Sequence, residues 1–244
     1  AGIIKEDGIT VVYKQKPEAE EVIKEVCKEK NSKYIEADFK HLEIKKSDIH
    51  SQIFDCTILG EKIENMEISL IGDHQVNNAV LALTVIKVLK DERNIEISED
   101  AIRRGFLNTA WPGRIEKIKD NPVFIIDGAH NEDGAKSLSK ALDKHFKGRK
   151  MTLLIGMLKD KDIDSVLSLL MDKFDKVITT TPNSDRAISC EELKDKVQKY
   201  VDDVIAISNI EDAVKYTLEN AKDDDIIISA GSLYMIGTVR TLVK

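Results

Sequence analysis

The densest group of chemically active side chains lies near the middle of the chain. Arg114 follows Trp-Pro-Gly, and Asp127, His130 and Asn131 complete the group within eighteen residues. A guanidinium can hold two phosphate oxygens, a carboxylate can accept from ribose hydroxyls, and an imidazole can donate to an anion. The same residues also have a structural interpretation, in which Arg114 forms an ion pair at a domain junction and Asp127 begins a turn before a capped helix. Spacing alone leaves both interpretations open.

A second group of polar side chains opens a predicted helix in the first half of the chain. His74, Gln75 and Asn78 lie in its first two turns, and the spacing of His74 and Asn78 places both on one face. An imidazole above a flat ring, with carboxamides that donate and accept, would suit the edge of an adenine. The alternative is a helix start capped by Asp73, with a solvated histidine.

Two later loops each follow an apolar strand and open a helix. One carries Lys161, and the other carries Ser232 and Tyr234. Lys161 and Ser232 could bind the carboxylate of a small substrate at the carboxyl edge of a sheet, where the loop 179–185 also lies. Otherwise, both segments are ordinary β–α turns.

Residues 111–244 alternate between apolar strands and amphipathic helices. This alternation predicts an α/β domain with a mainly parallel, Rossmann-like sheet that helices cover on both faces. The expected strands are 115–119, 123–126, 151–155, 176–180, 203–206 and 226–229, and the expected helices are 132–146, 163–173, 190–200, 210–220 and 234–243. Ligands bind such sheets at the carboxyl ends of the strands, and a helix N-terminus favours an anion. Asp127 is expected at such an end, with a helix beginning near Asn131.

Residues 1–110 predict a βαβ piece followed by a small antiparallel sheet and two helices. The expected strands are 10–13, 34–36, 41–44, 51–59 and 62–70, and the expected helices are 17–29, 73–90 and 98–106. A hairpin turn is expected at Gly60-Glu61, and Asp73 is the expected cap of its helix. Residues 108–110 are the expected linker between two domains, 1–110 and 111–244.

The composition narrows the possible functions. The net charge of −7 and the lack of a basic block argue against nucleic acid as a partner. There is no apolar run of membrane length, no signal peptide and no Gly-x-Gly-x-x-Gly motif for a dinucleotide. The three cysteines are widely spaced and follow no metal-ligand pattern. We therefore expect a cytoplasmic protein with reduced thiols, and we expect it to be a monomer.

Several motifs together resemble the folylpolyglutamate synthase and dihydrofolate synthase branch of the Mur ligase superfamily. They are Trp-Pro-Gly-Arg-Ile-Glu from residue 111, Ile-Asp-Gly-Ala-His-Asn from residue 126, Gly-Asp-His-Gln-Val-Asn-Asn-Ala from residue 72, Gly-Met-Leu-Lys-Asp-Lys-Asp from residue 156 and Gly-Ser-Leu-Tyr from residue 231. Their order and spacing agree with that branch, and the first segment, Ala-Gly-Ile-Ile-Lys, extends the likeness over essentially the whole chain.

The resemblance implies an enzyme that uses ATP and Mg²⁺ to join L-glutamate to folate, to dihydropteroate, or to both, through an acyl phosphate. By matching position, Arg114 would hold phosphate and Asp127 the ribose, while His74, Gln75 and Asn78 would lie at the adenine. The candidates for glutamate binding are His130, Lys161, Ser232 and Tyr234. The candidates for catalysis are Arg114, His130 and Lys161. A closed site between two domains would exclude water from the reaction.

The chain departs from that branch in one respect, because it has no Gly-x-x-x-x-Gly-Lys-[Ser/Thr] phosphate loop. The family carries this loop and the metal ligands in the earlier half of its ATP-binding domain, so no metal ligand is expected within residues 1–244. We therefore expect a piece of a longer ligase that has no turnover by itself: the end of the ATP-binding domain (1–110) and a complete glutamate ligase domain (111–244). The alternatives are a non-catalytic binding or regulatory protein and a ligase of the peptidoglycan branch.

Overall fold

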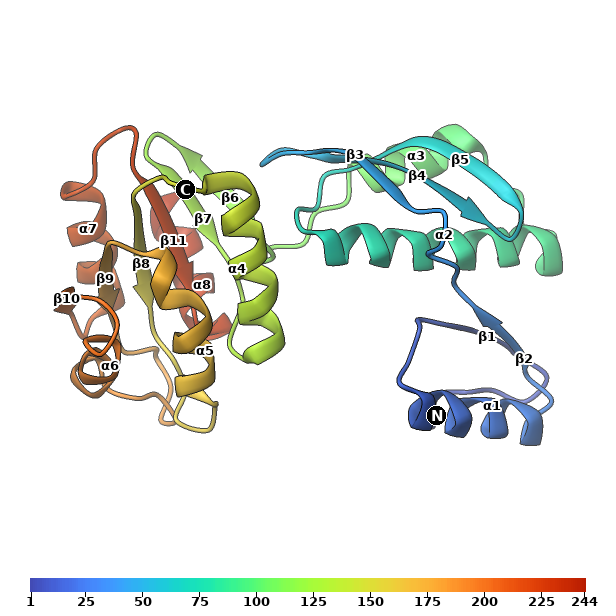
Figure 1. Cartoon of the computed structure of the whole chain (residues 1–244), viewed down its shortest axis with the longest axis horizontal. Helices are drawn as coiled ribbons and strands as arrows, with labels where there is room; N and C mark the ends of the chain where they lie inside the picture. Colours follow the sequence, from blue (N-terminus) through green and yellow to red (C-terminus); the bar gives the residue numbers. More distant parts are fainter. The chain divides into compact units, whose positions relative to one another are not determined.

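The computed structural model describes residues 1–244, and its contacts divide the chain into two compact units (Figure 1). Unit 1 contains residues 1–69 and 73–109, and unit 2 contains residues 70–72 and 110–244. The last boundary between the units thus falls between Thr109 and Ala110, just before the Trp-Pro-Gly-Arg motif. None of the helices combines the length and the apolar character that crossing a bilayer requires.

Unit 1 begins with the predicted βαβ piece. Strands β1 (Ile9–Val12) and β2 (Lys33–Glu36) pair in parallel, and helix α1 (Pro17–Glu29) connects them. Pro17 starts the helix because its ring fixes a helical φ angle and its missing N–H needs no partner in the first turn. The bounds of α1 are those predicted from the sequence.

The rest of unit 1 is an antiparallel sheet with two helices. Strands β3 (Glu43–Ser47), β4 (Gln52–Ile58) and β5 (Glu61–Ile68) lie in chain order, and helices α2 (Asp73–Arg93) and α3 (Glu99–Leu107) pack against them. The buried core joins the sheet to α2 through Phe54, Met66, Val76 and Val80. Asp73, which was expected to cap α2, is its first helical residue, whereas Ser98 caps α3 by accepting from the amide of Ala101.

The hairpin turn between β4 and β5 lies one residue earlier than predicted. Ile58 pairs with Glu61, so the turn residues are Leu59 and Gly60, with φ angles of +48° and +87°. Two consecutive positive φ angles are typical of a type I′ turn, which matches the twist of the two strands. Gly60-Glu61 was the wrong choice because Glu61 already belongs to the strand ladder.

Changing Leu59→Asn is expected to stabilise unit 1 by about 0.5–1 kcal/mol, because asparagine tolerates a left-handed φ better than leucine. Leu59 is 49% exposed, so the substitution gives up little buried apolar surface. Hydrogen exchange of the β4 and β5 amides measures the change, and Val85→Asn on the exposed face of α2 is the control. Faster exchange in the Leu59→Asn chain would contradict the assignment of the turn.

Unit 2 is built on a six-stranded sheet in the order β10-β9-β8-β11-β7-β6. Its strands are β6 (Glu116–Asp120), β7 (Val123–Ile126), β8 (Met151–Ile155), β9 (Lys176–Thr179), β10 (Asp203–Ala206) and β11 (Ile226–Ala230). Five strands are parallel, and β6 is an antiparallel edge strand with a register shift between Lys117 and Lys119. The mainly parallel α/β fold predicted for this part of the chain is confirmed.

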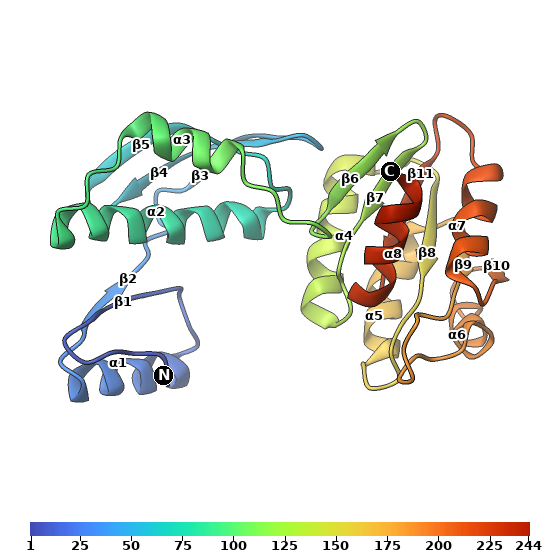
Figure 2. The same ribbon diagram turned by 180° about the vertical axis from the view of Figure 1, so that it is seen from behind.

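Helices cover both faces of this sheet, as Figure 1 and Figure 2 show from opposite sides. Helices α4 (Glu132–Phe146) and α5 (Ile163–Leu170) lie on one face, and α7 (Ile210–Glu219) and α8 (Leu233–Val243) lie on the other. Helix α6 (Cys190–Val197) packs beside β9 and β10. The central strands β7, β8 and β11 are mostly apolar because both of their faces are buried, and Phe124, Leu154 and Ile227 have no exposed surface.

Two predicted helices in unit 2 end early. The helix expected at 163–173 is α5 followed by a short 3₁₀ helix, Met171–Lys173, and the helix expected at 190–200 ends at Val197. In both places the chain must tighten to enter the next strand, which amphipathic spacing does not reveal.

The order of the strands places two loops at a topological switch point. Strand β8 is followed by α5 on one face, whereas the adjacent strand β11 is followed by α8 on the other. The two loops diverge but touch, because a Cβ atom on Gly231 would lie 2.6 Å from the carbonyl oxygen of Gly156. Gly231 has φ +109°, so the loop needs glycine both for its backbone angle and for the space. A crevice at such a point is where α/β proteins bind ligands.

Candidate functional site

A pocket of about 130 Å³ occupies this crevice at the start of α8. It brings together four residues that the sequence singled out, although they come from three separate segments of the chain. The lining residues are His130, Leu158, Lys161, Arg186, Gly231, Ser232, Leu233 and Tyr234. Three of them carry basic side chains and none is acidic. The pocket therefore suits a small anion.

Ser232 contributes a buried hydroxyl that no group of the protein uses. It is the N-cap residue of α8 and is 2% exposed, yet its Oγ atom makes no hydrogen bond and does not cap its own helix. Every other α-helix of unit 2 has a side-chain cap, from Asn131, Asp162, Ser189 and Asn209 respectively. A buried hydroxyl without a partner is costly, so a ligand that bonds to it at this helix N-terminus would be favoured.

Two of the basic residues of the pocket, Lys161 and Arg186, share a single carboxylate. Asp160 lies 3.5 Å from Lys161 Nζ and 3.4 Å from Arg186 Nη1, so the charge of this group of three is positive. His130 Nδ1 lies 2.7 Å from the carbonyl oxygen of Gly128. Because a carbonyl only accepts, Nδ1 is the donor and Nε2 remains for a ligand or a proton.

Asp127 lies at the end of β7, as predicted, but its carboxylate points into the protein. Oδ2 accepts from the amide of Ile115 at 2.9 Å, Oδ1 accepts from the amide of Ala129 at 2.8 Å, and the residue is 6% exposed. Burial raises the pKa of Asp127, whereas the two amides and the charges of Arg114 and His130 oppose that rise. In this structure the carboxylate joins two loops by accepting from their backbone amides. The sequence suggested ribose hydroxyls as its partners.

Arg114 sits in the tight turn that Asp127 holds. Gly113 has φ +75° and Ile115 has φ +47°, a left-handed angle that is uncommon for a β-branched residue. The amide of Gly128 donates to the carbonyl of Gly113 at 2.7 Å, which ties this turn to the loop after β7. The guanidinium of Arg114 is half-buried and makes no hydrogen bond or ion pair within the chain. It is therefore available to an anionic ligand.

The three residues proposed for adenine lie in unit 1, at the start of α2. Gln75 is buried, and its Oε1 accepts from Nδ2 of Asn78 at 3.2 Å. Asn78 is exposed and keeps its own side-chain carbonyl and its second N–H for another group, while His74 is half-buried. Gln75 thus orients Asn78 instead of facing solvent.

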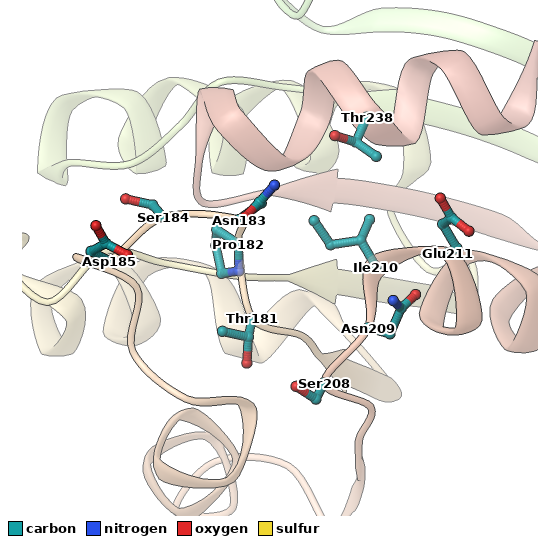
Figure 3. A pocket seen from close by; sticks show the side chains of 10 residues that line it. All are labelled: Thr181, Pro182, Asn183, Ser184, Asp185, Ser208, Asn209, Ile210, Glu211 and Thr238. Carbon is teal, nitrogen blue, oxygen red and sulfur yellow. The ribbon is translucent and has the colours of Figure 1, made fainter.

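A larger hollow of about 600 Å³ lies further along the same edge, and it differs in charge (Figure 3). It is lined by Thr181, Pro182, Asn183, Ser184, Asp185, Ser208, Asn209, Ile210, Glu211 and Thr238. Its only charged side chains are the carboxylates of Asp185 and Glu211, so it offers no cation to an anionic ligand. Charge therefore favours the smaller pocket as the anion site. Residues 181–185 of the loop 179–185, expected at this edge, line the larger hollow.

Two charged residues of this region were not predicted from the sequence. Arg186 lines the anion pocket. Its position directly after a strand-end loop was the feature of the sequence that could have identified it. Glu116 ends the Trp-Pro-Gly-Arg-Ile-Glu motif and accepts from the amide of Gly113 at 3.0 Å. No cluster of three or more histidine, cysteine or acidic side chains lies close enough together to hold a metal ion.

Comparison with known sequences relates residues 113–233 to the protein family described as Mur ligase, glutamate ligase domain. The folylpolyglutamate synthase of Lacticaseibacillus casei is 30% identical over 246 residues, which cover 98% of this chain and 55% of that protein. The dihydrofolate synthase/folylpolyglutamate synthase of Bacillus subtilis is 29% identical over 181 residues, which cover 74% of this chain and 42% of that protein. The chain spans about half the length of the curated relatives that it matches.

Solved structures show the same fold. The folylpolyglutamate synthase of Thermotoga maritima matches with a TM-score of 0.83 at 32% identity, covering 99% of this chain and 55% of that one. The Mycobacterium tuberculosis folylpolyglutamate synthase, crystallised with ADP and AMPPCP, also has a TM-score of 0.83 at 28% identity, covering 96% of this chain and 55% of that one.

Proposed function

Because this chain belongs to the Mur ligase family, in its folylpolyglutamate synthase type, we propose that it takes part in ATP-dependent addition of L-glutamate to a folate or to dihydropteroate. The observation that carries the proposal is the pocket at the start of α8, where basic side chains surround the unpartnered hydroxyl of Ser232. Glutamate has two carboxylates, and this pocket offers Lys161, Arg186 and a helix N-terminus to bind them.

Within this proposal the pocket residues have separate tasks. Ser232 donates its hydroxyl to one carboxylate of glutamate, and Lys161 and Arg186 supply charge to its carboxylates. His130, with Nε2 free, lies where it can take a proton from the amino group before that group attacks. Tyr234 is 58% exposed and forms a wall of the pocket.

The residues present also fit a nucleotide in part. The unpaired guanidinium of Arg114 suits phosphate oxygens, and the exposed carboxamide of Asn78, with His74 beside it, suits the edge of an adenine. Asp127 fits a ribose less well, because backbone amides already occupy both of its oxygens. ATP would supply the phosphoryl group that activates the acceptor carboxylate. Residues 1–109 would be the later part of the ATP-binding domain, and Mg²⁺ would need ligands from outside this chain.

Binding of L-glutamate to the whole 244-residue chain tests the pocket directly. We expect amide chemical shifts to change in the loops after β7, β8 and β11 when L-glutamate is titrated into the ¹⁵N-labelled chain. Lys161→Met should weaken binding by about tenfold and Ser232→Ala by about three- to tenfold, because each loses a hydrogen bond to a charged group. Lys136→Met, which removes a surface lysine of α4, is the matched control. Shifts confined to the larger, acidic hollow would contradict the proposal.

Acceptor specificity separates the remaining alternatives. A protein that makes dihydrofolate uses dihydropteroate as the acceptor, and one that extends polyglutamates uses a reduced folate. A protein that does both uses either acceptor. The same assay with a muramyl acceptor tests the peptidoglycan branch. ADP release without any of these acceptors, or glutamate binding without turnover in every form of the protein, would favour the binding or regulatory alternative.

A further inference from the structure

The turn that carries Arg114 is also held by a second carboxylate, which has no role in the proposed function. Glu116 Oε2 accepts from the amide of Gly113 at 3.0 Å. Nε of Arg240 donates to Oε1 and Oε2 at 3.0 and 3.1 Å, and Nζ of Lys244 donates to Oε1 at 3.2 Å. The side chain of Glu116 is only 20% exposed, so this cluster is partly shielded from water.

The two basic partners of Glu116 belong to α8 and to the residue that follows it, so a single helix connects this cluster to the anion pocket. Ser232 opens α8 in the pocket, and Arg240 lies about 12 Å further along the helix axis. Between them, Ile236 packs so closely on the turn that a Cβ atom on Gly113 would lie 2.6 Å from its Cδ1. Leu233 packs on Gly128 in the same way. The helix therefore touches the pocket at one end and the turn along its length.

The backbone of the turn requires such support. Ile115 is held at φ +47°, a strained angle for a β-branched residue that persists only when surrounding contacts impose it. Asp127 binds the amide after Arg114, and Glu116 binds the amide before it. Burial raises the pKa of Glu116, but the hydrogen bonds from Gly113, Arg240 and Lys244 outweigh it, so the pKa lies below its ordinary value. Glu116 is thus ionised at neutral pH, as its two cationic partners require.

We infer that Glu116 and Arg240 are positioning residues, which fix the backbone before Arg114 and tie this turn to the helix that opens the anion pocket. The identity of the ligands that Arg114 and the pocket bind rests on the proposed function. The positioning itself rests on the hydrogen bonds alone. Neither residue lines the anion pocket; each acts through Arg114.

Amide hydrogen exchange on the whole chain tests the positioning without any ligand. In Glu116→Gln the side chain keeps one acceptor oxygen instead of two and loses its charge, so the amide of Gly113 should exchange at least about tenfold faster. Arg240→Met, which leaves Glu116 in place, should have a smaller effect of the same sign, and Arg240→Lys should restore most of the protection. Glu211→Gln, in the larger hollow, is the matched control. Unchanged exchange at Gly113 in the Glu116→Gln chain would overturn the inference.

Binding of inorganic pyrophosphate then tests whether Glu116 acts through Arg114. We expect Glu116→Gln to weaken binding by about three- to tenfold in the wild-type background and to have no further effect in an Arg114→Ala chain. Equal losses in both backgrounds would show that Glu116 acts independently of Arg114 and would overturn this part of the inference. A chain whose pyrophosphate affinity does not depend on Arg114 would instead remove the phosphate role in the proposed function, and the exchange result would still decide the positioning.

Discussion

Replacing Arg114 with alanine is expected to lower the turnover of ATP-dependent glutamate addition by about 10²- to 10³-fold, with a much smaller change in the KM for ATP. The guanidinium makes no hydrogen bond or ion pair within the chain, so it is available to a ligand. Phosphate charge increases as the phosphoryl group is transferred, and a fixed cation then stabilises the transition state more than the bound substrate. The loss should therefore fall on kcat.

The measurement follows ADP and the glutamylated product in a form of the protein that supports turnover. Arg114→Lys keeps the charge but loses the bidentate hydrogen bonding to phosphate, so its turnover should lie between those of the wild type and Arg114→Ala. Arg104→Ala is the matched control, because Arg104 is an exposed arginine of α3 that pairs only with Asp100 on the same helix. A wild-type kcat in the Arg114→Ala protein at saturating ATP would eliminate the phosphate role of Arg114.

Replacing Asp127 with alanine is expected to lower the free energy of unfolding of unit 2 by about 2–4 kcal/mol. The change leaves the amides of Ile115 and Ala129 without an acceptor in a region that water does not reach. Part of this loss is offset because a buried charge is removed at the same time. The slowest amides of β11 report global opening of the unit, so their exchange rates measure the effect.

Two further variants separate this explanation from a general loss of charge. Asp127→Asn keeps one acceptor oxygen and should cost less than Asp127→Ala. Asp224→Ala removes an exposed carboxylate of unit 2 and should leave the β11 exchange rates unchanged. If Asp127→Ala had no more effect than Asp224→Ala, the two hydrogen bonds would not hold the loops together.

Much of the fold followed from local patterns in the sequence. Helices α1 and α4 begin where Pro17 and Asn131 predicted, because proline at the first helical position and an asparagine cap act within a few residues. The turn after β4 was misplaced by one residue. Its position depends on which residues pair across the hairpin, and Leu59 gives no compositional sign of a positive φ angle.

The arrangement of the candidate site was predictable only where topology decides it. Lys161 and Ser232 meet because they follow adjacent parallel strands, and strand ends could be read from the sequence. The inward orientation of Asp127 could not be read in this way, because it depends on the amide of Ile115 across a hairpin and on a strained backbone. The role of Glu116 was hidden for the same reason, since its partner Arg240 lies 124 residues away.

The antiparallel strand β6 has a consequence for the solubility of the sheet. It forms one border of the sheet, and its residues are Glu-Lys-Ile-Lys-Asp, with a register shift in the middle. Free backbone groups on a border strand invite pairing with the strands of other molecules, and charged side chains and bulges discourage it. The residue that anchors the Arg114 turn thus begins a segment that also protects the sheet against aggregation.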